Sequence, residues 1–215
     1  MTSDARRTYD KLDSDVGSLI SLHPKVAEPG VGRPPGDTGP LLRATVVLIH
    51  TAWENYVEQA ILEANAWILG EIGDDHSALP HGLRQAVATH AAKKDPWAIT
   101  GNGWSQIARA HAEGKVARLN TPSRDNVNDL TEECTGVVDI LASVSWRNKK
   151  HDQVSDDLNQ FVHEIRGEIV HKGTTPGPLD LTGVKDWRGF TGRLVGAFDQ
   201  KLAMGVKKIH GASPW

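Results

Sequence analysis

Apolar side chains recur every three or four positions through much of the chain, with polar side chains between them. This period is typical of amphipathic helices that bury one face. The longest example runs from Leu41 to about Leu69, and its apolar face consists of Leu42, Val46, Ile49, Trp53, Val57, Ala60, Ala64 and Trp67. Shorter stretches with the same period predict further helices at residues 4–22, 81–94, 105–118, 124–144, 154–171 and 184–209. Because no segment alternates apolar and polar residues as a strand does, the sequence predicts an all-α fold.

Turn-forming residues mark the ends of these predicted helices. The stretch HPKVAEPGVGRPPGDTGP at 23–40 is dense in proline and glycine and predicts a loop, as does WAITGNGW at 97–104. Ser123 lies where an N-cap is expected and Gly173 where a helix ends in a left-handed residue. No linker is evident in the 215 residues, so we expect a single all-α domain over 1–215.

Cysteine content and apolar run length indicate the compartment. The chain has a single cysteine, Cys134, which excludes an internal disulfide framework and fits a reducing compartment such as the cytosol. Its apolar neighbours favour a core position over a nucleophilic one. No apolar run is long enough for a membrane span, and the opening MTSDARRTYD lacks the apolar segment of a secretion signal. We therefore expect a cytoplasmic protein without a membrane association.

The formal net charge of −3 argues against a generic polyanion binder. Binding to nucleic acid would need local basic surface, for which WRNKKH at 146–151 and the basic residues between Arg84 and Arg124 are candidates. Taken alone, each is more simply interpreted as a solvated loop or helix face.

The predicted helix at 154–171 combines an apolar face with candidate chemistry. Leu158, Phe161, Val162, Ile165 and Ile169 share the apolar face, whereas Arg166, Gly167 and His171 lie off it. His171 follows Arg166 by five positions, so the directions of the two side chains differ by about 140° on an ideal helix. Gly167 lies between them, and a glycine inside a helix costs roughly 1 kcal/mol relative to alanine. We expect a partner helix or a ligand to approach the backbone closely there.

Arg166 and His171 have the chemistry required to cleave a phosphodiester bond without metal. The helix dipole favours a protonated imidazole at His171, near the predicted C-terminus, and Glu168 is placed to pair with it. Histidine serves as a general acid or base near neutral pH, and an arginine guanidinium binds phosphate and stabilises its developing charge. By spacing alone, two polar residues on the wet side of a helix remain the simpler interpretation.

Three polar residues of the long helix project within about 40° of one another: Arg43, His50 and Glu54. They could line the same cleft as accessory groups, with Glu54 orienting a histidine or pairing with Arg43. The alternative, which the residues themselves favour, is a polar stripe at the edge of the core. No H-E-x-x-H pair accompanies the ten histidines, and one cysteine does not make a common zinc site, so we expect neither metal nor cofactor.

Three stretches resemble the HEPN superfamily, in particular its RiboL-PSP-HEPN branch. They are LLRATVVLIHTAWENYVEQAI (41–61), LNTPSRDNVNDL (119–130) and FVHEIRGEIVHKG (161–173), in family order. The resemblance spans 41–173 and implies a helical bundle with a long early helix and flanking helices. It also implies a two-fold homodimer and metal-independent endoribonuclease activity, often of a toxin or phage-defence effector, for which an antitoxin protein is a further candidate partner.

The resemblance carries Arg166 and His171 over as catalytic residues, meeting those of a second chain at the dimer interface. It supports Glu54 more than His50 as an accessory residue. Two positions depart from the family pattern: Gly167 replaces a polar residue, often asparagine, and Lys172 precedes Gly173. The leading hypothesis is an endoribonuclease acting on single-stranded or looped RNA. The alternative, which Gly167 favours, is a non-catalytic HEPN-like module that binds RNA, a nucleotide or a protein.

Overall fold

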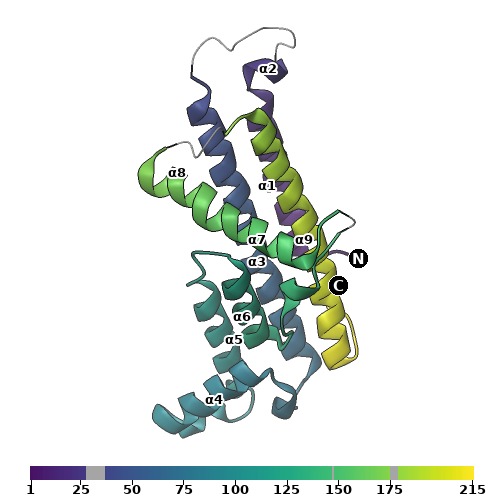
Figure 1. Ribbon diagram of the computed structural model, residues 1–215. Coiled ribbons are helices and arrows are strands. Elements are labelled where there is room, and N and C mark those ends of the chain that lie inside the picture. The colour runs from purple at the N-terminus through teal and green to yellow at the C-terminus, as the bar shows by residue number, and fades with distance from the viewer. Residues whose placement is uncertain (28–36, 147, 175–178) are drawn as a thin grey trace.

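Three long helices form the body of the molecule in the computed structural model, which describes residues 1–27, 37–146, 148–174 and 179–215 (Figure 1). They are α1 (Asp4–Ser21), α3 (Gly39–Glu71) and α9 (Leu181–His210). The 33 residues of α3 make it about 50 Å long at 1.5 Å per residue. Both α1 and α9 pack along α3, and α1 also contacts α9. The short helix α2 (Pro24–Ala27) follows α1.

A second group of helices packs around the C-terminal half of α3, at the end of the molecule away from α2 (Figure 1). It comprises α4 (His81–Lys93), α5 (Gly103–Val116) and α6 (Arg124–Thr135), with the 3₁₀ turns η1 (His76–Ala78), η2 (Pro96–Ile99) and η3 (Ile140–Ser143). Two side-chain hydrogen bonds from α3 hold α6 and the segment that leads into it. The indole of Trp53 donates to the Pro122 carbonyl oxygen at 3.0 Å, and the Asn65 amide donates to the Cys134 carbonyl oxygen at 2.9 Å.

The remaining helical segment crosses α3 obliquely before the chain enters α9 (Figure 1). It runs through α7 (His151–Asn159), the π-helical turn η4 (Gln160–Ile165) and α8 (Arg166–Lys172). Gly173 ends α8 in the left-handed region with φ 64°, as expected for a residue at this position. Because α8 packs against α3, this crossing brings the late arginine–histidine segment onto the early long helix.

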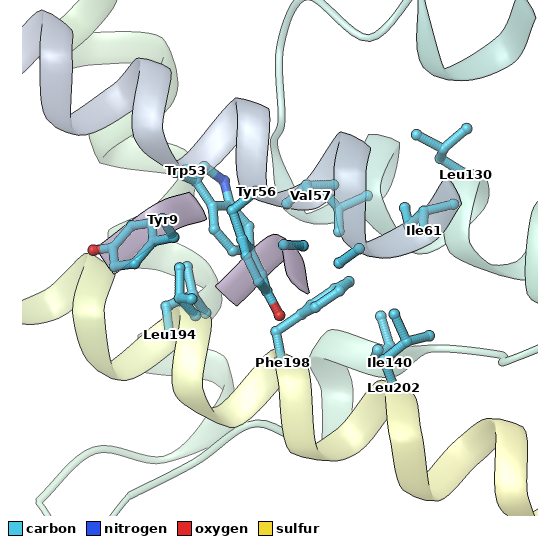
Figure 2. Packing of buried hydrophobic residues seen from close by; sticks show 14 of the residues in the cluster. Tyr9, Trp53, Tyr56, Val57, Ile61, Leu130, Ile140, Leu194, Phe198 and Leu202 are labelled. Carbon is cyan, nitrogen blue, oxygen red and sulfur yellow. The ribbon is translucent and has the colours of Figure 1, made fainter. Parts of the chain in front are cut away.

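The core is a connected cluster of buried apolar side chains centred on α3 and α9 (Figure 2). Trp53, Tyr56 and Phe198 are fully buried, and the Phe198 ring meets both other rings edge to face with centroids 5.9 Å apart. Aromatic pairs prefer this geometry over face-to-face stacking. The apolar residues that recur every three or four positions along α3 therefore belong to the core, since this helix contributes buried residues along its whole length.

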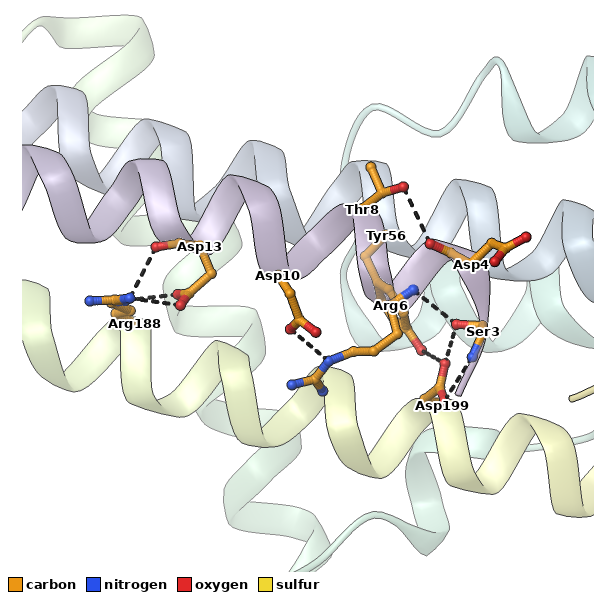
Figure 3. Close-up of polar contacts among 9 residues, drawn as sticks. All are labelled: Ser3, Asp4, Arg6, Thr8, Asp10, Asp13, Tyr56, Arg188 and Asp199. Atoms are coloured by element: carbon orange, nitrogen blue, oxygen red, sulfur yellow. Dashed lines mark hydrogen bonds and ion pairs between the residues drawn. The ribbon is translucent and has the colours of Figure 1, made fainter. Parts of the chain in front are cut away.

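Polar contacts fasten the N-terminus to α9 (Figure 3). The buried Asp199 carboxylate accepts hydrogen bonds from the hydroxyls of Ser3 and Tyr56, the latter at 3.1 Å. Further along, the Arg188 guanidinium binds the Asp13 carboxylate through two nitrogens, at 2.8 and 2.7 Å. The buried Asp199 carboxylate needs its two hydroxyl donors because an unpaired charge in the core is costly.

The structure confirms the all-α prediction: its described residues form no strand beyond a single bridge between Trp146 and Lys149. The helices expected at 4–22, 41–69, 81–94, 105–118 and 184–209 all form, with ends shifted by a few residues.

Two predicted loops are partly helical. Within 23–40 the chain forms α2 and begins α3 at Gly39, while 28–36 lie outside the described residues. Within 97–104 the turn η2 packs directly against the start of α5 at Gly103. Short helical turns of this kind are stabilised by their caps and not by an apolar period, so periodicity misses them.

The helix expected at 124–144 ends early, at Thr135. Gly136 takes the left-handed conformation with φ 76°, and the Asn128 side chain accepts a hydrogen bond from the Leu141 backbone at 3.0 Å. This bond folds the following segment back onto α6 as η3. Cys134 therefore lies near the end of the helix, but it is fully buried, and burial raises the pKa of its thiol to about 12.

Candidate functional site

The π-helical turn η4 directly precedes Arg166 and sets its direction. A π turn holds more residues than an α turn, so the side chains beyond it are rotated relative to a continuous α-helix. Ile169 of α8 is buried at 8% exposure. Measured from Ile169 on an ideal helix, Arg166 lies about 60° away and His171 about 160° away. Arg166 is accordingly half-buried at the edge of the α3 contact, and His171 is exposed.

Arg166 is on α8, which packs against α3, and its charge reaches two polar residues of that helix, His50 and Glu54. Its positive charge acts on the pKa of both side chains. Burial raises the pKa of the Glu54 carboxyl, and Arg166 opposes that shift. The His50 Nδ1 and the Glu54 Oε2 are 3.9 Å apart, too long for a hydrogen bond. The crossing of α3 and α8 thus brings a guanidinium to an imidazole and a carboxyl that lie more than 100 residues earlier in the chain.

His50 is a buried, neutral histidine. It is 2% exposed, and burial together with the Arg166 charge lowers its pKa to about 4. Its ring packs against Phe161 of η4 with centroids 6.0 Å apart. The Nε2 atom is buried without a hydrogen-bond partner among the described residues. An unsatisfied buried polar atom is costly to the fold, so a bound water or a ligand at this atom would be favourable.

Arg43 does not join this group. Its guanidinium lies beside Gly39 in the first turn of α3. Arg43 and Glu54 are 11 residues apart, about 16 Å along the helix. The structure therefore brings Glu54 and His50 to Arg166 and leaves Arg43 near the start of α3.

His171 faces an open hollow of about 800 Å³ between α8 and the start of α9. The hollow is also lined by His163, Glu164, Gly167, Glu168, Lys172 and Trp187. Glu168 forms its ion pair with Lys172, at 2.9 Å, rather than with His171 as the sequence suggested. A lysine at i+4 from a glutamate is favourably placed, because residues four apart are neighbours on a helix surface.

Gly167 is open to its surroundings. A Cβ added there would meet no atom of the described residues within 4 Å beyond its own helix. The close approach that we expected at this glycine is therefore not made by any of the residues that the structure describes. Val170, one turn further on, is 48% exposed. Gly167, which also lines the hollow, and Val170 therefore leave a small or apolar surface of α8 uncovered by the described residues.

Arg166 and His171 thus have different neighbours within one chain: Arg166 lies with the α3 residues, and His171 lies on the hollow beside α9. Sequence reasoning missed Trp187, whose ring stacks on Phe161 with centroids 5.0 Å apart and forms one wall of the hollow. It also missed the π turn, because the same apolar residues fit an ordinary helix.

Of the predicted basic stretches, 146–151 is tied into the fold. The Trp146 ring packs edge to face on Phe190, and Lys149 pairs with Asp157. Arg147 lies outside the described residues. Among the described residues no three His, Cys, Asp or Glu side chains gather in a way that could hold a metal ion. None of the helices in this described part is long and apolar enough to cross a membrane.

Comparison with protein families matches the RiboL-PSP-HEPN family model over residues 10–204. The match includes the three stretches that suggested the resemblance and extends it into α1 and α9. Searches of curated proteins and of solved structures gave no match. Domains of this family include ribonucleases as well as non-catalytic members. Since the match covers most of the chain, the protein belongs to the RiboL-PSP-HEPN family, and it carries a nuclease or RNA-related module of the HEPN type.

Proposed function

We propose that the protein is a metal-independent endoribonuclease that cuts single-stranded or looped RNA. The observation that carries the proposal is the position of Arg166, which is half-buried where α8 packs against α3 and whose charge acts on Glu54 and His50. A guanidinium at such a half-buried position interacts with a phosphate more strongly than it would in bulk water. His171, exposed at the end of the same helix, supplies the titratable group.

The proposed reaction is transesterification within the RNA strand. A base, assigned to His171, takes the proton from the ribose 2′-hydroxyl as that oxygen attacks the adjacent phosphorus. The phosphorus–5′-oxygen bond breaks, and an acid returns a proton to the leaving 5′-oxygen. Arg166 stabilises the charge that develops on the phosphoryl oxygens. The products are a 2′,3′-cyclic phosphate and a 5′-hydroxyl, so protons and bonds balance without a metal.

The proposed site is composite, at the two-fold axis of a homodimer. Gly167 and Val170 support this assembly because both are open on the outer surface of α8. Two such helices can approach closely where glycine removes the side chain. A two-fold contact would place the same surface of each chain against the other and bring each Arg166 to the partner's side.

The family assignment also supports a cellular role as a toxin or phage-defence effector in the cytoplasm, with an antitoxin protein as its regulator in the toxin case. In this proposal the whole chain, 1–215, acts as one domain. Glu168 and Gly167 are retained only as accessory residues of the site, and Arg43 is not, because it lies near the start of α3. Glu54 and His50 contribute as the α3 residues on which the Arg166 charge acts.

The alternative is a HEPN-like module that binds RNA, a nucleotide or a protein without cutting. The observation that favours it is Gly167, which removes the polar side chain that follows the arginine in the family pattern. In this alternative Arg166 binds a phosphate and His171 is a surface residue.

The decisive experiment is incubation of the purified protein with mixed cellular RNA in EDTA. We expect fragments that carry 2′,3′-cyclic phosphate or 3′-phosphate ends. Cleavage that is abolished by EDTA and restored by Mg²⁺ or Mn²⁺ would contradict the mechanism. Binding without any cleavage, in the presence or absence of metal, would leave the module as the better description.

A further inference from the structure

The helices α4 and α5 carry a strong local excess of positive charge. Residues 81–118 contain six lysines and arginines and two acidic residues, so their formal charge is +4, although the whole chain is −3 and the rest is therefore −7. The six basic residues are Arg84, Lys93, Lys94, Arg109, Lys115 and Arg118. Such asymmetry within an acidic chain is expected to attract an anionic partner to one end of the molecule.

A hollow of about 770 Å³ lies between α4 and α5 within this basic region. Lys93, Lys94 and His90 line its α4 side, and Gln106 and His111 line its α5 side. Both lysines are exposed. The hollow therefore offers ammonium and amide donors at its rim.

One carboxylate, Glu133 of α6, also faces this hollow, but its charge is matched. Its two oxygens bind His111 Nε2 at 2.7 Å and Lys115 Nζ at 2.8 Å. Burial alone would raise the pKa of Glu133, but these hydrogen bonds hold it below the ordinary value. The charge of Glu133 is thus matched by His111 and Lys115. It does not offset the positive charge of the exposed Lys93 and Lys94.

An exposed tryptophan directly precedes Ala98, which lines the hollow. Trp97, on the turn η2 that joins α4 to α5, has 77% of its surface exposed, the largest exposed fraction of any aromatic residue that the structure describes. Its backbone nitrogen donates to the Asp95 carboxylate at 2.9 Å, and its carbonyl oxygen accepts from the Thr100 hydroxyl at 2.8 Å. The backbone of the residue is therefore fixed while its indole is open to solvent.

Gly103 contributes to this placement. A Cβ at Gly103 would overlap the Ala98 carbonyl oxygen, so only glycine lets η2 pack against the first turn of α5. A large apolar ring held at the surface by a capped turn and a required glycine does not contribute to the core. It suits a recognition element, because burying so large an aromatic ring against a partner would be favourable.

We propose that α4, η2 and α5 form a binding surface for single-stranded RNA, separate from the Arg166–His171 site. Trp97 stacks on an unpaired base, and Lys93, Lys94 and His90 contact the phosphates on either side. Basic grooves beside exposed aromatic rings bind single strands in this way, because every base has a stacking face and every linkage carries a charge. The inference rests on the proposed function only in taking RNA as the ligand.

The surroundings of Trp97 favour RNA over a protein partner. Protein hot spots are surrounded by a ring of contacts that excludes water from the central aromatic residue. Here the neighbouring side chains along α4 are two exposed lysines, which suit a phosphate backbone. The outer surface of α8, with its glycine and valine, is a better match for a second copy of the chain.

The test uses the full-length chain carrying His171→Ala, so that a fluorescent 12-nucleotide oligouridine remains intact during anisotropy measurements. In this background we expect Trp97→Ala to weaken binding roughly 5- to 100-fold. Trp97→Phe should retain most of the affinity, since a phenyl ring still stacks. The double variant Lys93→Gln/Lys94→Gln should reduce the slope of log affinity against log salt by about 1 to 1.5, because each phosphate that a lysine neutralises on a single strand adds about 0.7 to that slope.

Matched controls are available elsewhere on the surface. Lys207 and Lys208 form a second adjacent pair of exposed lysines near the end of α9, and Met204 is an apolar side chain with 56% exposure. Lys207→Gln/Lys208→Gln and Met204→Ala should leave both affinity and salt slope unchanged.

The inference is overturned if the His171→Ala parent does not bind the oligouridine. It is equally overturned if Trp97→Ala and Lys93→Gln/Lys94→Gln bind the oligouridine as tightly as that parent. It is also overturned if Trp97→Ala alters only the mass measured by light scattering, since the surface would then contact protein. Its failure is distinguishable from that of the nuclease proposal. Binding that depends on Trp97 in a chain that never cuts RNA supports this surface alone, whereas cleavage unaffected by Trp97→Ala with unchanged affinity removes this surface alone.

Discussion

At the scale of single residues, His50 couples the candidate site to stability. Its pKa of about 4 in the folded chain lies below the ordinary histidine value of 6.5. The unfolded chain therefore binds the proton first as the pH falls from 6.5 to 4, and the folded state loses stability over that window. The full loss is on the order of 3 kcal/mol, since one pKa unit corresponds to about 1.4 kcal/mol.

We expect His50→Gln to remove this part of the pH dependence. The free energy of unfolding, measured with urea at pH 7, 5 and 4, should fall less steeply than in the parent. His163→Gln is the control, because His163 is exposed and should leave the parent profile unchanged. Equal slopes for His50→Gln and the parent would show that His50 is not held neutral by the fold.

Arg166→Ala and His171→Ala should each lower the rate of RNA cleavage by roughly 10²- to 10⁴-fold, as expected for a phosphate-stabilising cation and a general acid or base. Neither change opens a core cavity, since His171 is exposed and Arg166 only half-buried, so the stability cost should stay within about 1 kcal/mol. Single-turnover cleavage and thermal unfolding measure the two effects separately. His163→Ala, which alters the same hollow outside the motif, should keep most of the activity. Wild-type cleavage by His171→Ala would refute the proposed pair.

At the scale of elements, α8 offers a test of whether its outer surface is covered. An alanine at Gly167 meets no atom of the described chain and should stabilise an isolated helix by roughly 0.5–1 kcal/mol. If two α8 helices pack across an axis at this glycine, the added methyl group weakens the dimer and lowers cleavage. We therefore expect Gly167→Ala to raise the melting temperature of the monomer while reducing the mass measured by light scattering at low concentration.

Gly70→Ala is the matched control, because Gly70 of α3 is also helical and also has open space around it. It should increase stability without changing mass or activity. An unchanged dimer in Gly167→Ala would place the interface elsewhere on the molecule.

The sequence predicted those elements that carry their own period, and it failed where contacts distant in the chain decide. Along α3 the core positions repeat every three or four residues, so that helix was predictable. The end of α6 was not, because it depends on a hydrogen bond between Asn128 and the backbone of Leu141. The π turn was hidden because Phe161 and Val162 are buried on either kind of helix.

In the candidate site too, the residues were predictable from local pattern, but their contacts with distant parts of the chain were not. Arg166 and His171 were identified from residue type and resemblance, and Glu54 and His50 from their shared direction on one helix. That Arg166 lies beside Glu54 and His50 depends on the crossing of α3 and α8, which no local pattern encodes. Trp97 was assigned to a loop, since its exposure follows from the packing of η2 against Gly103 and not from its neighbours in sequence.

At the scale of the whole molecule, the composite site predicts recovery of activity by exchange of subunits. In a mixture of Arg166→Ala and His171→Ala chains, a mixed dimer keeps one site with both residues when each Arg166 works with the partner's His171. Roughly a quarter of the wild-type activity should return, because half the dimers are mixed and each has one of its two sites. The recovered activity is measured as RNA cleavage after the two variants are mixed and refolded together. Each variant refolded alone is the control. Mixed dimers confirmed by mass that stay inactive would contradict a site shared in this way.

The length of α3 has a consequence for where an RNA would be cut. The helix carries His50 and Glu54 near its middle, and the α4–α5 end of the molecule is built around its C-terminal half. From His50 to Glu71 the helix advances on the order of 30 Å at 1.5 Å per residue. A single continuous helix therefore fixes the distance between the proposed base-stacking surface and the proposed cleavage site. A strand held by Trp97 would be cut at a set number of nucleotides from the held base, so fragment ends would follow distance along the strand more than sequence.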